Sequence, residues 1–315
     1  MRSRNVESQQ LGAWLFTGMT APLAQFAGKT GWQTVVLAVF ACLAVSWLLG
    51  RTTRITGRWI SILEILWLVI VLAVVGRWIC GSWPSGNVFP AVPLTLLALG
   101  AFSASRGRET AARAGSTVFW LVALVFSIVA AAGLGEVGLE SLGDIDSGFD
   151  PRLAVISLTP ALTVFLPGEG SEVPLKVVAA VWGFAVLMTV LVTGALSLPV
   201  AVGLDMPLYE WVKGLRIAGT LQRFEALVSV ALTMGWFALV SFVLHIGGEL
   251  AENLKAGGKI GGVWSIAAAS GLIMVSRTQM GAGTVLYGCV LLWIAVPGVA
   301  VFVRKNKIEK SKNNA

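Results

Sequence analysis

The chain has 315 residues, of which 56% are hydrophobic and 12% are charged, and its formal net charge is +7. Soluble domains carry about 25% charged residues, so this composition excludes a soluble globular protein and predicts one that spans a bilayer. The basic excess does not indicate nucleic-acid binding, because the sequence shows no soluble basic face with interleaved aromatic residues.

Ten apolar spans follow one another along the chain, each close to the roughly 20 residues that cross a bilayer. We place them at 9–27, 31–50, 59–81, 88–104, 114–133, 151–168, 174–196, 224–248, 260–276 and 281–303. The stretch 197–223 contains two prolines and predicts a short re-entrant or interfacial helix. The predicted fold class is therefore all-α, a single membrane domain over residues 1–315.

The basic residues predict the orientation of these spans. If the N-terminus is cytoplasmic, the inner segments hold 16 of the 23 lysines and arginines, which is the bias that the positive-inside rule describes. The segment "GEVGLESLGDIDSGFD" (135–150) carries five acids and no base, so we expect it outside. Both termini, including the basic tail 304–315, are expected in the cytoplasm.

Two of the spans are interrupted at their centres. "TGMTAPLAQF" (17–26) lies in the first span and "ISLTPALTVF" (156–165) in the sixth, and each opens a block of five spans. Interrupted helices at corresponding positions of two halves indicate an inverted-repeat transporter core. We therefore predict repeats over 9–133 and 151–303, with helices one and six broken near Gly18–Pro22 and Ser157–Pro160, as in LeuT-like folds.

A broken helix frees backbone N–H and C=O groups, which lipid cannot satisfy but a bound ligand can. An amino acid offers both charges that such half-helix ends accept. The alternative is that glycine and proline only kink packed helices. The candidate ligand-binding residues are Gly18, Met19, Thr20, Pro22, Ser157, Thr159, Pro160 and, inside the third span, Glu64.

Glu64 is a candidate because ionisable residues inside membrane spans are commonly functional. Its alternatives are that it reaches the nearby interface or pairs with Arg58. His245 and Glu249 are spaced to share one helical face. We expect them at a solvated helix end, with a proton-sensitive pair as the alternative.

The sequence gives little support for an enzyme. It contains a single histidine, no phosphate-binding glycine loop and three cysteines that lie in different spans. We expect no enzymatic activity, no cofactor and no metal.

Three stretches in order resemble one known family. They are the opening span with Gly18, Pro22, Ala27-Gly28 and Trp32; "ASRGRETAARAG", with Gly107, Glu109 and Arg113; and "MPLYEWVKGLRIAGTLQRFEAL", with Pro207, Arg216, Ile217, Arg223 and Glu225. Together they resemble the B-subunit family of spore germinant receptors, the germination permeases of the amino acid/polyamine/organocation transporter superfamily.

The resemblance implies a nutrient-sensing subunit of the spore inner membrane that works with an A-type and a lipoprotein C-type subunit. It implies gating or structural roles for Glu109, Arg113, Arg223 and Glu225. A secondary amino acid transporter on the same fold is the alternative function, and a membrane structural or assembly protein is a third.

Overall fold

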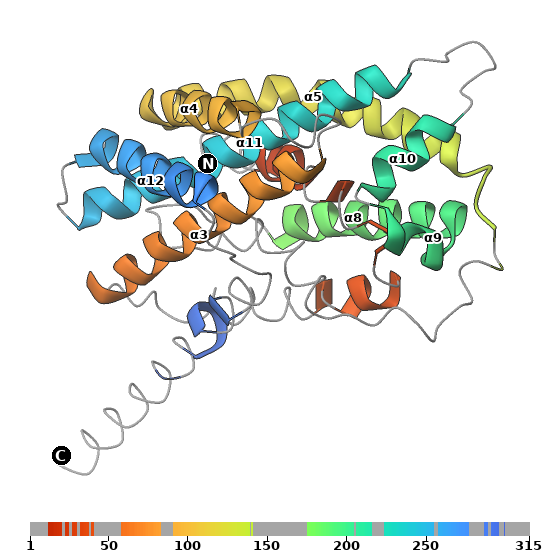
Figure 1. Ribbon diagram of the computed structural model, residues 1–315, viewed down its shortest axis with the longest axis horizontal. Helices are drawn as coiled ribbons and strands as arrows, with labels where there is room; N and C mark the ends of the chain where they lie inside the picture. Colours follow the sequence, from red (N-terminus) through yellow and green to blue (C-terminus); the bar gives the residue numbers. More distant parts are fainter. Residues whose placement is uncertain are drawn as a thin grey trace.

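The computed structural model describes residues 12–20, 23–24, 27–29, 32–37, 39–40, 58–82, 91–138, 140, 175–204, 206–215, 224–254, 258–276, 287–288, 291–295 and 299. Over these ranges the regular structure is helical, without a strand, which confirms the predicted all-α class (Figure 1).

The longer helices of the described ranges are α3 (Arg58–Ser82), α4 (Ala91–Ser105), α5 (Arg108–Gly133), α8 (Leu175–Leu196), α11 (Phe224–Asn253) and α12 (Gly258–Val275). The shorter ones are α9 (Leu198–Gly203), α10 (Pro207–Gly214) and a π-helical turn, η2 (Leu291–Ala295). All six longer helices fall on predicted spans. The short helices α9 and α10 lie in the stretch 197–223, where the two prolines predicted one short re-entrant or interfacial helix.

Five of the described helices are long and apolar enough to cross a membrane, and they include segments of α3, α5, α8, α11 and α12. Helix α4 is apolar but shorter. The chain is therefore a multi-pass integral membrane protein.

Helix α11 lies at the centre of the described helices, and α3, α4, α5 and α12 all pack against it (Figure 1). Its sequence is apolar on every side, so its central residues 238–248 are buried without interruption, as expected of a helix enclosed by others. Small residues let α12 approach α11 closely: a side chain at Gly262 would collide with Ala251. Close backbone approach at such residues is how membrane helices pack.

Large apolar side chains also cover the outside. On α4 and α5, Phe102, Trp120 and Leu124 are more than half exposed. In water such a surface would drive aggregation or binding, whereas in a bilayer it contacts the acyl chains. The outward faces of the helices therefore agree with a membrane location.

Helices α3 and α12 run side by side in the same direction. Gly76 of α3 lies against Met274 of α12, and the next residue, Arg77, reaches the end of α12. The Arg77 guanidinium donates hydrogen bonds to the carbonyl oxygens of Ile273 at 3.0 Å and Ser276 at 2.7 Å. A cation at this position satisfies the last carbonyls and the negative end of the α12 dipole.

Exposed charged residues lie at both ends of the described bundle. The start of α3, the α4–α5 turn, the end of α11 and the start of α12 share one end, at the left of Figure 1, and there Arg58, Arg106, Arg113 and Glu252 are exposed. The other end has exposed Glu136, Glu225 and Lys213.

Candidate functional site

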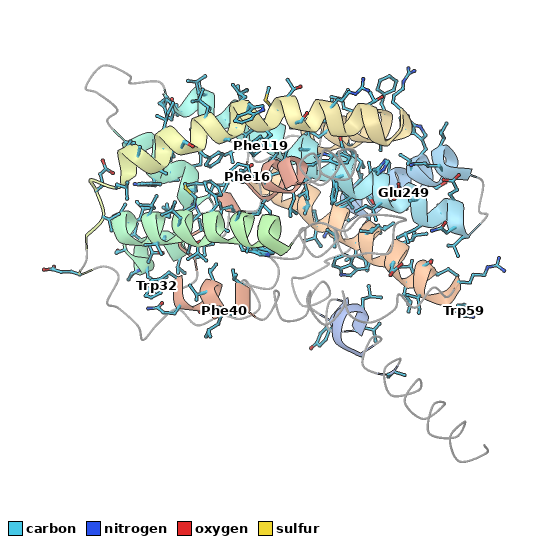
Figure 2. All side chains as sticks on the ribbon, turned by 180° about the vertical axis from the view of Figure 1, so that it is seen from behind. Phe16, Trp32, Phe40, Trp59, Phe119 and Glu249 are labelled. Atoms are coloured by element: carbon cyan, nitrogen blue, oxygen red, sulfur yellow. The ribbon has the colours of Figure 1, made fainter. Side chains whose placement is uncertain are left out.

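The residues 12–20 form a helix that lies between α5, α8 and α11. Trp14 packs edge-on against Phe242 of α11 with ring centroids 4.7 Å apart. On another face Phe16 lies against Phe119 of α5 at 5.3 Å and Phe184 of α8 at 4.6 Å, as Figure 2 shows for Phe16 and Phe119. The 12–20 helix is thus enclosed by protein, not by lipid.

Gly18, Met19 and Thr20 are all buried and all helical. The absence of a side chain at Gly18 allows a close approach, because a Cβ there would lie 3.3 Å from Cα of Leu239 on α11. Helical bonding is also seen just beyond, where the Ala27 N–H donates to the Leu23 carbonyl at 2.8 Å. Pro22, at the expected centre of the interruption, lies outside the described residues.

The hydroxyls of this helix are bonded to its own backbone. Thr17 donates to the Ala13 carbonyl at 2.8 Å, and Thr20 donates to the Thr17 carbonyl at 2.7 Å. Such bonds allow a threonine to be buried inside a membrane helix without another partner. Each hydroxyl can still accept a hydrogen bond from a ligand.

The second predicted half of the site lies outside the described residues. This applies to Ser157, Thr159 and Pro160, and also to Arg223. Arg113 is exposed on α5, and Glu109 belongs to the first turn of the same helix. Glu225 is exposed on the first turn of α11. The Gly107 of the same motif has φ 99° and ψ 164°, a backbone conformation that only glycine adopts readily, and it separates α4 from α5.

Glu64 is buried on α3, with 5% of its surface exposed. Among the described residues, its Oε2 atom has no hydrogen-bond partner. It therefore neither reaches the interface nor pairs with Arg58, which is exposed at the start of the helix. A buried carboxylate oxygen without a partner is what an amine or a proton would bind.

The structure corrects the expectation of a solvated helix end at His245. The imidazole is 4% exposed, and its Nε2 atom lies 3.1 Å from Oε1 of Glu249. The ring also lies beside Trp14, with centroids 6.0 Å apart. Ser241, one turn earlier on the same face, has a buried hydroxyl for which the described ranges provide no partner. Helix α11 therefore presents a polar ridge in which Ser241 and His245 are buried and Glu249 is partly exposed.

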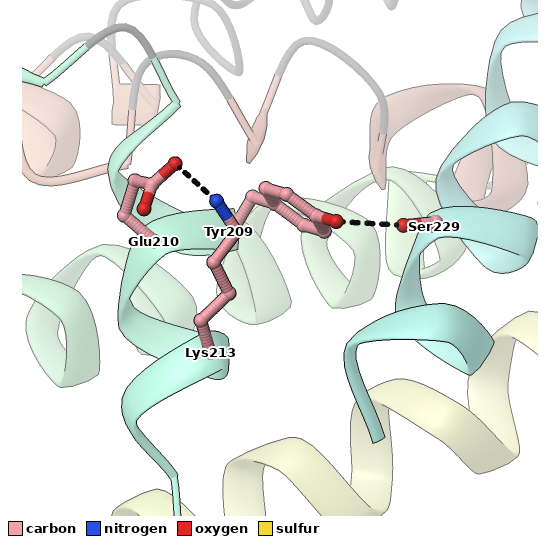
Figure 3. Close-up of polar contacts among 4 residues, drawn as sticks. All are labelled: Tyr209, Glu210, Lys213 and Ser229. Atoms are coloured by element: carbon pink, nitrogen blue, oxygen red, sulfur yellow. Dashed lines mark hydrogen bonds and ion pairs between the residues drawn. The ribbon is translucent and has the colours of Figure 1, made fainter. Parts of the chain in front are cut away.

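A second polar group, not anticipated from the sequence, fixes α10 to the bundle. The Ser229 hydroxyl of α11 donates to the Tyr209 hydroxyl at 3.0 Å, and Lys213 lies over the Tyr209 ring (Figure 3). Lys213 also donates to Glu210 at 2.7 Å, and this hydrogen bond raises the pKa of Lys213 above its usual value. On the other face, Trp211 Nε1 donates to Glu136 at 3.3 Å.

The apolar half of α10 could have been found from the sequence, because Leu208, Trp211 and Val212 are spaced to share one face. Their partners on α5 and α11 are distant in sequence. No pattern along the chain marks those contacts.

Neither a model of a known protein family nor a curated protein sequence matches the chain. Within the described ranges, no cluster of three histidine, cysteine, aspartate or glutamate side chains is placed to hold a metal ion.

Proposed function

We propose that the chain is the membrane subunit of a spore nutrient-germinant receptor, which recognises a small nutrient, an amino acid by chemical class, and triggers germination. The proposal includes ten membrane helices in two inverted five-helix repeats, with both termini cytoplasmic. It includes the cell membrane and spore inner membrane as location, and the A-type and lipoprotein C-type subunits as partners.

The observation that carries the proposal is the position of the opening stretch. Gly18, Met19 and Thr20 are buried among α5, α8 and α11, although this stretch contains the glycine, threonine and proline that a lipid-facing helix would avoid. Support also comes from the three family-like stretches: Gly107 stands at the turn before α5, and Pro207 starts α10.

A secondary amino acid transporter is the alternative, and Glu64 favours it. A buried acidic residue in a membrane helix is typical of proton and substrate pathways. The two functions share one site but differ in whether the ligand crosses the membrane.

The deciding experiment combines binding, flux and germination. The purified chain in nanodiscs is tested for binding over an amino acid panel, and in proteoliposomes for uptake of any amino acid that binds. Binding without uptake, together with loss of one nutrient response in spores of a deletion strain, would support the receptor. Uptake would favour the transporter, and neither binding nor uptake would leave a structural role.

A matched pair of variants tests the location of the site. Met19→Ala and Met188→Ala each remove a buried methionine, the first from the opening stretch and the second from α8. Both should reduce stability by about 2–5 kcal/mol. Only Met19→Ala should change the affinity or preference for the nutrient; an equal effect of Met188→Ala would remove the opening stretch from the proposed site.

A further inference from the structure

The contacts of α11 show how far along the bundle axis Glu64 lies. A Cβ at Gly247 of α11 would lie 2.6 Å from Ile266 Cδ1 and 3.5 Å from Leu68 Cδ1, so Leu68 of α3 and Ile266 of α12 stand at one level. Because α3 and α12 run in the same direction, the residues one turn earlier in each helix also share a level. In α3 that residue is Glu64, which lies on the same face of the helix as Leu68.

Glu64 is therefore far from the opening stretch along the bundle. The residue of α12 at its level is Gly262, where an added side chain would collide with Ala251 of α11. Gly18 lies against Leu239, twelve residues earlier than Ala251 on the same helix. Twelve residues of an α-helix rise about 18 Å, whereas one residue of fully extended chain spans at most about 3.6 Å. A single amino acid bound at Gly18 cannot reach Glu64.

Within the described ranges, no basic side chain neutralises Glu64. Arg58 is exposed at the start of α3, and Lys259, the base of α12, contacts Glu249 at 3.5 Å. The Glu64 side chain is buried, and its Oε2 atom has no hydrogen-bond partner among the described residues. A buried carboxylate without an opposing charge costs several kcal/mol. The position therefore suits a cation that comes from outside the chain.

We infer that Glu64 is the anionic ligand of a monovalent metal cation, Na⁺ or K⁺, at a site separate from that of the nutrient. One positive charge gives the buried site zero net charge, whereas a divalent ion would leave it charged. Trp67, three residues on and 2% exposed, adds an indole ring, whose face attracts cations. The exposed start of α3 at Arg58 is about 9 Å away along the helix axis. The inference involves no nutrient and so goes beyond the proposed function.

The packing at this level favours a bare ion over an organic amine. Helices α11 and α12 are so close that a Cβ at Gly248 would lie 2.6 Å from Val263 Cγ2. Gly288 lies equally close to Trp67, with 2.5 Å between an added Cβ and Cδ1 of the ring. These sides leave no room for an alkyl chain, whereas a dehydrated Na⁺ or K⁺ is no larger than a water molecule. Glu64 should therefore select a small cation without a carbon skeleton.

Thermal unfolding in different salts tests the inference on the full chain. The chain in nanodiscs, without any amino acid, is melted in NaCl, in KCl and in choline chloride at equal ionic strength, with choline as the cation too large for the site. An ion that binds only the folded protein should raise the melting temperature by roughly 2 °C or more for each tenfold increase in its concentration. Glu64→Gln should melt at one temperature in all three salts. Glu252→Gln, at an exposed acid of α11, should keep the rise.

A second measurement follows the ion itself. Equilibrium binding of radioactive sodium, or of radioactive rubidium in place of K⁺, should be saturable in the original chain and in Glu252→Gln, and lost in Glu64→Gln. Equal melting temperatures of the original chain in the three salts would overturn the inference, since a carboxyl group that stays protonated holds no metal cation. A salt effect that Glu64→Gln retains would overturn it as well. Circular dichroism in choline chloride confirms that each variant is folded before it is compared.

Discussion

Gly18 of the opening stretch lies directly against Leu239 of α11, and a methyl group added to it would come within 3.3 Å of the Leu239 Cα atom. Val240, the next residue of α11, lies against a glycine of another helix, since a Cβ at Gly100 of α4 would lie 2.7 Å from Val240 Cγ1. Leu239 and Val240 thus lie between two glycines. These glycines determine how closely the 12–20 helix and α4 approach α11.

Gly18→Ala should therefore destabilise the protein by about 1–3 kcal/mol, because backbone atoms of α11 cannot yield as a side chain would. Thermal unfolding in detergent micelles measures the change. Gly183→Ala is the matched control, since Gly183 is exposed in the middle of α8 with open space around it and alanine favours the helix. An equal loss of stability in both variants would contradict this view of Gly18.

Gly133→Ala should loosen α10 from the bundle. A side chain at this position would collide with the indole of Trp211, which is buried and bonded to Glu136. We expect faster hydrogen exchange over residues 207–214, with exchange in α3 unchanged. Gly135→Ala, two residues on and with nothing near its Cβ, should have no such effect. The prediction is wrong if α10 exchanges at the original rate in Gly133→Ala.

Glu64→Gln should leave the thermal stability unchanged or raise it, because the amide keeps the shape of the side chain and cannot ionise in its buried position. If Glu64 serves a ligand or proton pathway, the same change should abolish amino acid binding or uptake. Glu252→Gln, at an exposed acid near the end of α11, is the control. A large loss of stability in Glu64→Gln would instead show that the carboxylate is a structural group.

Gly107→Ala should lower the free energy of unfolding by about 1–3 kcal/mol, because the backbone conformation at this position is unfavourable for alanine. The position has φ 99°, and nothing lies within 4 Å of the added methyl group. The loss should therefore be independent of the size of the new residue, so that Gly107→Ala and Gly107→Leu have similar melting temperatures. A much lower melting temperature for leucine would point to crowding.

The α10 helix should become less stable in strongly alkaline solution. The hydrogen bond to Glu210 raises the pKa of Lys213 above its usual value. The stabilisation is present below the usual pKa of lysine and is lost as pH rises through the raised value. Hydrogen exchange of α10, corrected for the intrinsic pH dependence, should show this loss in the original chain and not in Lys213→Gln.

Hydropathy predicted the elements where an apolar run has clear limits. The third span was expected at 59–81 and α3 runs from Arg58 to Ser82. The ends of α5 and α11 were misjudged because polar residues continue both helices: α5 begins at Arg108, and α11 extends to Asn253. In α11 the extra turn is held by the Glu249–Lys259 contact and by burial of Leu250, neither of which shows in hydropathy.

For the candidate site, the sequence identified residues that are buried but could not say what faces them. A glycine in a membrane helix can allow either a ligand or another helix to come close. At Gly18 the structure shows the close approach of a helix, because Leu239 of α11 lies against it. His245 was misjudged for a related reason: Trp14, which covers it, lies more than two hundred residues away in the sequence.

The contact of Arg77 with the end of α12 has a mechanical consequence. Its two hydrogen bonds, together with the packing of Gly76 on Met274, connect a helix of the first half of the chain to a helix of the second half. A tilt of α12 would either break these two hydrogen bonds or carry α3 with it. The two helices should therefore behave as one lever, joined where Arg77 contacts Ile273 and Ser276.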